Sequence, residues 1–241
     1  MSLDVNVLKK GMTRVPMTDY SAVGRKSKSK GARFELETAK NLSKWWGHDF
    51  HRVPASGGLH WKGSNNVVGD IVAPIEAGFP FVVECKNREE WTIENLFLNN
   101  KEIKNWWAQV VGDAKESGKI PMLIFTRNRA KTFVMMAYNE DLIKEIEDRG
   151  YPLMVSNVEY VDGYKDTHCY KTFTTVLEAI TSFKPRKSQG EEHLLHYFNP
   201  KEYDWQKSGL VRETKKMEEA KQLDVEESLD LLVNSYLEGE K

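Results

Sequence analysis

Periodic and alternating apolar positions divide the chain between Lys30 and Arg149 into helices and strands. Helix-forming residues and a 3.6-residue apolar period predict helices over Lys30–Gly47, Lys101–Gly118 and Asn139–Arg149. Short runs of β-branched and aromatic residues between turn residues predict strands, which are His48–Pro54, Val67–Ala73, Phe79–Lys86, Ile120–Thr126 and Thr132–Tyr138. The core order is therefore helix, three strands, helix, strand, which predicts an α/β fold.

The periodicity weakens after Tyr151. Tyr151–Tyr170 is expected to add an edge strand or two, and Thr172–Phe183 a short amphipathic helix. Lys184–Gly190 has the composition of a linker, and Glu213–Leu237 is predicted to be an acidic helix. We therefore expect three parts, which are a flexible arm over residues 1–24, one folded domain over 25–184, and a linker with a helical C-terminal extension over 185–241.

Composition excludes several classes of protein. Hydrophobic residues make up 40% of the 241 positions and charged residues 29%, and no apolar run approaches the roughly 18 residues of a membrane span. Residues 1–20 lack the apolar core of a signal peptide, so we expect a protein that works in the cytoplasm without a membrane. Cys85 and Cys169 are the only cysteines, which argues against a disulfide framework.

Charge is unevenly distributed, although the net charge is only −1. Residues 24–44 carry seven basic groups against Glu35 and Glu37, a local charge of +5, whereas residues 213–241 carry nine acids and four lysines, a charge of −5. This polarity suits a DNA-binding body with an acidic extension that contacts a protein partner or a second copy. Solvated charged faces remain an alternative, and the basic tract at 25–31 is either a strap that contacts phosphates or a solubilising linker.

Candidate chemistry lies at the end of the Phe79–Lys86 run. On a strand, Glu84 and Lys86 alternate with Cys85 and lie on one face, and charges on such an apolar strand are costly to bury unless they serve each other, a metal or a substrate. Asp70, fourteen residues before Glu84, supplies a second carboxylate at the margin of a neighbouring strand. A structural ion pair between Glu84 and Lys86 is the alternative.

The first helix offers a third carboxylate. At 100° per residue Glu35 falls on the stripe of Ala39, Leu42 and Trp46, whereas Glu37 lies roughly opposite. We therefore expect Glu35 to face the sheet and its acidic residues.

The pattern of Asp70 followed by Glu84-Cys85-Lys86 resembles the core of the PD-(D/E)XK nucleases, with Gly69 where the motif has proline. The order of elements is similar to their αβββαβ core, which implies a restriction-endonuclease-like fold with a mixed central sheet flanked by helices. The run K-G-A-R-F-E at 30–35, with Arg52 and Ser56, resembles archaeal-type Holliday-junction resolvases over about residues 28–135. Two departures are Leu36, where that family often has arginine, and a longer loop between Ser56 and Asp70.

The resemblance implies a set of roles for these residues. Asp70, Glu84 and the Cys85 backbone carbonyl would bind Mg²⁺, with Mn²⁺ as a substitute and Glu35 as a further ligand, directly or through water. Lys86 would orient the attacking water or stabilise the pentacovalent oxyanion. DNA would be contacted by Lys28, Lys30, Arg52 and Ser56. Gln109 is left out because it lies opposite the apolar stripe of its helix.

These expectations predict a metal-dependent, structure-selective DNA endonuclease that cuts four-way junctions. Two symmetric cuts require two active sites, which a twofold homodimer supplies. The alternatives are another PD-(D/E)XK DNA nuclease, of restriction type or an exonuclease, and a catalytically silent DNA-binding protein of the same fold. The presence of the acidic residues of the motif argues against a catalytically silent protein.

Overall fold

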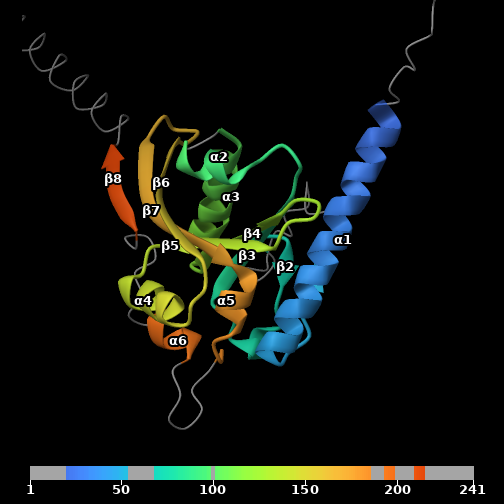
Figure 1. The fold of residues 1–241 in the computed structure, drawn as a ribbon. Coiled ribbons are helices and arrows are strands. Elements are labelled where there is room, and N and C mark those ends of the chain that lie inside the picture. Colours follow the sequence, from blue (N-terminus) through green and yellow to red (C-terminus); the bar gives the residue numbers. More distant parts are fainter. Residues whose placement is uncertain (1–19, 54–67, 99–100, 186–192, 199–208, 215–241) are drawn as a thin grey trace, which may run out of the picture.

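The computed structural model describes residues 20–53, 68–98, 101–185, 193–198 and 209–214. A mixed sheet runs through the centre in the order β3-β4-β5-β7-β6 (Figure 1). Its strands are β3 (Phe81–Asn87), β4 (Ile120–Thr126), β5 (Phe133–Ala137), β6 (Leu153–Val161) and β7 (Thr167–Val176). A sixth strand, β8 (Leu210–Thr214), pairs with the first half of β7. The predicted α/β fold with a mixed central sheet flanked by helices is confirmed.

One parallel pair defines the core of the sheet. The strands β3 and β4 are parallel and are joined through α3 (Lys101–Ser117), whereas β4–β5, β5–β7 and β6–β7 are antiparallel. Two short strands, β1 (His51–Arg52) and β2 (Ile71–Val72), form an antiparallel pair beside β3. The Asp70 N–H donates to the Val83 carbonyl at 2.8 Å and connects this pair to β3.

Helices cover both faces of the sheet. On one face α1 (Tyr20–Trp46) contacts β3, and α5 (Leu177–Thr181) lies near its C-terminal end, where Trp45 Nε1 donates to the Phe183 carbonyl at 2.8 Å (Figure 1). On the other face α3 buries Trp106 against Phe125 and Trp107 against Tyr170. Shorter helices complete the fold, namely α2 (Ile93–Phe97), α4 (Glu140–Asp148), α6 (Leu194–Tyr197) and the 3-10 turn η2 (Ile75–Ala77). Within the described residues, no helix combines the length and the apolarity of a membrane span.

Helix α1 begins ten residues earlier than the sequence pattern predicted. It starts at Tyr20, so the Arg25–Gly31 tract is helical and is not a flexible strap. Lys and Arg are good helix formers, and the helix accommodates Gly24 and Gly31. The predicted boundary between an arm and the domain at residue 24 therefore falls inside a helix.

The second half of the chain also departs from prediction. The first part of the predicted helix over Thr172–Phe183, up to Val176, belongs to strand β7, and only Leu177–Thr181 is helical. Thr172, Thr174 and Thr175 are β-branched and buried, which suits a strand with neighbours on both sides. Tyr151–Tyr170, which was expected to add an edge strand or two, contains the edge strand β6 and the start of β7, but β7 lies between β5 and β6 and is not an edge strand.

Part of the predicted linker and extension belongs to the folded body. Leu194 and Phe198 are fully buried, and β8 is a strand of the sheet rather than the start of an acidic helix. Leu194-Leu195 and Tyr197-Phe198 are two short apolar pairs in an otherwise polar stretch, and such a short segment does not establish a periodicity. The remainder of the predicted acidic helix, residues 215–237, lies outside the described residues.

Candidate active site

Strand β3 places Glu84 and Lys86 on the face of the sheet that α3 covers. Glu84 is only 3% exposed, and the Lys86 ammonium donates to its Oε1. Lys86 Nζ also donates to Gln109 Oε1 on α3 at 2.9 Å. The lysine is therefore held between a strand carboxylate and a helix amide.

Asp70 is fixed beside β3 by its own backbone and by its side chain. Its N–H donates to the Val83 carbonyl, and its Oδ2 accepts from the Cys85 N–H at 2.8 Å. Since the N–H and C=O of one strand residue point to the same side, the Cys85 carbonyl also faces Asp70. Asp70 and this carbonyl thus lie on the same side of β3, and Glu84, one residue earlier, is close enough for its charge to interact with that of Asp70.

Gly69 makes this close approach possible. Its φ is +80°, and a Cβ there would lie 2.6 Å from the Val83 carbonyl oxygen. Proline, which the motif name specifies at this position, fixes φ near −65° and is incompatible with this backbone. The departure from the motif therefore follows from how the chain enters β2 in this protein.

Burial shapes the electrostatics of Glu84. Desolvation, followed by the nearby charge of Asp70, raises the pKa of Glu84 to about 7, although Lys86 opposes the shift. Asp113, one turn after Gln109 on α3, adds to the increase. One lysine does not balance these carboxylates, so the site favours an additional cation.

Cys85 lies on the opposite face of β3, towards α1. Burial, with the charges of Asp70 and Glu84, raises the pKa of its thiol well above the ordinary value, while a hydrogen bond with Thr38 opposes the shift. The thiol is therefore protonated at neutral pH and is not a nucleophile.

Glu35 faces the body and Glu37 faces solvent, as the helical period predicted. The Glu35 side chain is 14% exposed and forms an ion pair with Arg52 Nε from β1. Among the described residues, no three His, Cys, Asp or Glu side chains gather closely enough to hold a metal ion. The structure thus brings Asp70, Glu84 and Lys86 together but does not add Glu35 as a third carboxylate in direct reach.

The expected DNA-contacting residues have different surroundings. Lys28 is exposed on α1, and Lys30 forms an ion pair with Glu89 just after β3. Arg52 is half-buried against Glu35. Ser56 lies outside the described residues.

Gln109 is a site residue that the sequence pattern missed. The helical period correctly put it away from the apolar stripe, but a long side chain beside Trp106 reaches the end of β3. Asp113 lies four residues further along the same flank of the helix. Two polar residues at this spacing, next to a tryptophan that packs on the sheet, were the available signal.

Comparisons with known proteins identify the family of this chain. Residues 26–189 match the model of a family described as phage putative PDDEXK endonuclease. Among solved structures, the chain is similar to Hjc, a Holliday junction resolvase from Archaeoglobus fulgidus, with 16% identity, a TM-score of 0.29, and coverage of 72% of this chain and 98% of that one. No curated protein matches the sequence. Since the family model spans most of the chain, the expectation of a PD-(D/E)XK nuclease is confirmed, and the protein belongs to the phage PDDEXK endonuclease family.

Proposed function

We propose that the protein is a divalent-metal-dependent DNA endonuclease that hydrolyses phosphodiester bonds at Asp70, Glu84 and Lys86. The observation that carries the proposal is the burial of two neighbouring carboxylates beside a single lysine at the end of β3. A purely structural ion pair would need only Glu84 and Lys86. The presence of Asp70, held by two backbone groups of β3, favours a site built for a cation.

The donor set fits Mg²⁺ or Mn²⁺. Asp70, Glu84 and the Cys85 carbonyl would hold the ion, since all three are hard oxygen donors and the Asp70 side chain is bonded to β3 at the residue next to Glu84. When bound, the ion would neutralise charge on the scissile phosphate and lower the pKa of water. Glu84 would have to lose its proton to bind, which an ion beside it favours.

Lys86 is held in place to act on the reacting group. Of the three N–H bonds of its ammonium, one is directed to Glu84 and one to Gln109, so a third is available as far as the described residues are concerned. That N–H would orient the attacking water or donate to the oxyanion that develops on phosphorus. Gln109 is a positioning residue in this scheme.

Arg52 and Glu35 form the second part of the site. Glu35 engages Nε of the guanidinium, which leaves the terminal N–H groups of Arg52 to bind a phosphate oxygen. We assign Glu35 the positioning of Arg52 rather than direct metal binding, since it does not join the other carboxylates.

The finer proposal concerns the substrate. The residues Lys30, Glu35 and Arg52 that support the likeness to junction resolvases lie on α1 and β1 beside the site. We propose branched DNA, a four-way junction, as the substrate and a twofold homodimer as the active form, because paired cuts need two sites. Cleavage of linear duplex by a restriction-type enzyme is the second candidate.

A substrate panel tests the proposal. The protein is incubated with a four-way junction, a flap, a linear duplex and a single strand, with Mg²⁺, with Mn²⁺ and with EDTA. We expect metal-dependent nicks that Asp70→Asn and Glu84→Gln abolish while DNA binding persists, and that Glu37→Gln retains. Undiminished cutting by the first two variants would remove the assignment of the site. Binding without any metal-dependent product would identify a silent DNA-binding protein.

A further inference from the structure

We propose that the turn Arg127–Lys131, between β4 and β5, is a second DNA-contacting element that holds the phosphate backbone of a duplex beside the active site. This inference rests on the proposed function, because it assumes that the substrate is DNA. Neither the motif nor the residues expected to contact DNA include this turn.

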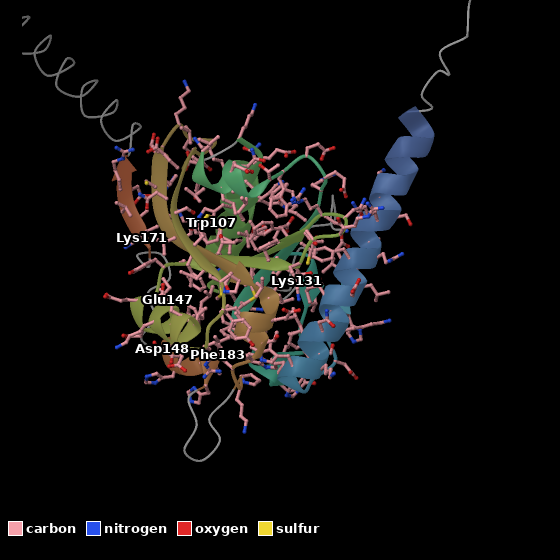
Figure 2. The ribbon with its side chains drawn as sticks, in the orientation of Figure 1. Trp107, Lys131, Glu147, Asp148, Lys171 and Phe183 are labelled. Atoms are coloured by element: carbon pink, nitrogen blue, oxygen red, sulfur yellow. The ribbon has the colours of Figure 1, made fainter. Side chains whose placement is uncertain are left out.

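The turn leaves the sheet at the end of β4 that lies beside the C-terminal end of β3, where Lys86 is located. Strands β3 and β4 are parallel, with Lys86 opposite Phe125 and Asn87 opposite Thr126, so the turn begins directly after the register partner of Asn87. The Arg88 N–H donates to the Thr126 carbonyl at 3.1 Å and keeps the two strand ends together. Figure 1 shows the turn extending from the sheet towards α1, and Lys131 lies on the side of the body that faces α1 (Figure 2).

The turn is basic and exposed. Arg127, Arg129 and Lys131 are all exposed. The Arg127 guanidinium lies over the Trp91 ring at 5.6 Å, and Lys131 pairs with Glu178 at 2.9 Å. Within the described part of the chain, the Arg129 guanidinium has no ion pair, and its side chain is exposed to solvent.

A neighbouring acid, Glu89, does not cancel this charge because its carboxylate is already used. It accepts from the Asn128 N–H at 3.1 and 3.3 Å, and it forms an ion pair with Lys30 of α1. One carboxylate thus fixes the basic turn to the helix that carries Glu35 and Lys28. The turn and the basic part of α1 are therefore held in a constant relation, as a surface that follows a DNA backbone requires.

Backbone conformation singles out Arg129. Its φ is +61°, and only one other described residue with a Cβ, Lys165, has a positive φ. The Ala130 N–H donates to the Arg127 carbonyl at 3.2 Å, so Arg129 occupies the third position of a closed turn. Glycine or asparagine suits that position best. An arginine held there, against the preference of the backbone, is consistent with a role for its side chain.

Lys165 offers a matched control. It is exposed, basic and left-handed at φ +69°, but it belongs to the turn between β6 and β7, and β6 lies at the opposite end of the strand order from β3. Replacing either residue by glycine removes one positive charge and one strained Cβ. The two variants should therefore affect folding alike and differ only in DNA binding.

The experiment compares Arg129→Gly and Lys165→Gly with the wild-type chain. Binding to a fluorescent duplex and to a four-way junction is measured in EDTA from about 0.05 to 0.3 M salt, and melting temperature is measured alongside. We expect neither variant to melt below the wild type. Arg129→Gly should reduce the slope of log K against log salt by about 0.9 and weaken binding about eightfold near 0.1 M salt, whereas Lys165→Gly should change neither. Arg127→Gln combined with Arg129→Gly should roughly double the loss of slope.

The outcomes separate this inference from the proposed function. Equal binding by Arg129→Gly and the wild type would overturn the role of the turn, even if the wild type cuts DNA. Equal losses of DNA binding in both glycine variants would show that the effect comes from net charge alone, and would also overturn the role of the turn. A wild type that binds DNA but never cuts it with Mg²⁺ or Mn²⁺ would overturn the nuclease proposal and leave the turn to be judged by binding alone. A wild type that does not bind DNA would overturn both.

Discussion

The Lys86 ammonium donates to the side-chain oxygen of Gln109 at 2.9 Å, which joins the candidate catalytic strand to the helix that connects β3 to β4. Without this contact, Lys86 would be held only by Glu84, and Glu84 is also a proposed ligand of the metal ion. Gln109 would therefore keep the lysine in place when Glu84 binds the metal ion.

This relationship makes a prediction for Gln109→Ala. The cleavage rate at saturating DNA should fall about tenfold, equivalent to about 1.4 kcal/mol of the barrier, while KM stays nearly constant. Asn105→Ala, at an exposed position on the same helix, should cut like the wild type. A change in KM alone would indicate that Gln109 contacts the DNA rather than positioning Lys86.

Replacing Gly69 is predicted to destabilise the folded protein. In Gly69→Ala the new Cβ would meet the Val83 carbonyl oxygen at 2.6 Å, in addition to the cost of a left-handed backbone. We expect a loss of about 2–5 kcal/mol in unfolding free energy, measured by urea denaturation. Gly47→Ala is the control, because Gly47 has φ +78° but no atom near the position of a Cβ. It should lose only about 1 kcal/mol. Similar losses in the two variants would contradict the crowding argument.

The helical phase of α1 was predictable because its two glutamates, Glu35 and Glu37, lie on different sides of the helix, and only Glu35 falls on the apolar stripe. Glu35 shares a stripe with Leu42 and Trp46, and the structure buries those two while leaving Glu37 exposed. Periodicity fixes such a face but says nothing of how far a side chain reaches along it. This is why Gln109 was missed, since its contact with Lys86 depends on the distance between α3 and the end of β3.

Other elements depended on contacts between distant parts of the chain. The threonines of β7 are compatible with either helix or strand in isolation, and the partners β5, β6 and β8 decide in favour of a strand. Strand β8 itself contains only five residues and follows a long polar stretch. Its pairing with β7 had no local signature.

The pair Glu35 and Arg52 predicts a positioning effect on cleavage. Glu35→Gln should weaken the hold on the Arg52 guanidinium and lower kcat/KM about 10–100-fold, whereas Glu37→Gln should have little effect. Arg52→Lys should lose activity similarly, because lysine cannot hold Glu35 and a phosphate oxygen in the same planar geometry. If Glu35→Gln and Arg52→Lys are additive when combined, the two residues act independently, and the proposed coupling is wrong.

The raised pKa of Glu84 predicts how the stability of the metal-free protein depends on pH. The pKa is about 7 in the folded state against an ordinary value of 4.5, so the folded state binds the proton more tightly. Stability from this group should be complete below pH 4.5 and should be lost as pH rises through 7, with a total on the order of 3 kcal/mol. Denaturation in EDTA at pH 5 and at pH 8 measures the difference, which Glu84→Gln should remove. Added Mg²⁺ should restore stability at pH 8, where the carboxylate is ionised, more than at pH 5.

The C-terminal region predicts different results for two truncations. The sequence pattern placed the end of the folded domain at residue 184, so a chain ending at Gly190 would be expected to fold and cut DNA, but the structure buries Leu194 and Phe198 completely. Losing both side chains should cost about 5 kcal/mol or more, which is comparable with the whole stability of many domains.

The shorter chain would also lose β8 and the contacts of its Glu213. In the full chain His168 is buried between Asp162, at 2.9 Å, and Glu213, at 3.1 Å. A chain ending at Thr214 keeps these contacts and removes only residues 215–241, so it should melt like the full protein and retain metal-dependent cleavage. Light scattering then tests the dimer contact that the acidic stretch was expected to make. A folded monomer that no longer cuts would assign dimer formation to residues 215–241. If the chain ending at Gly190 proves as stable as the one ending at Thr214, then β8, Leu194 and Phe198 do not support the body as we infer.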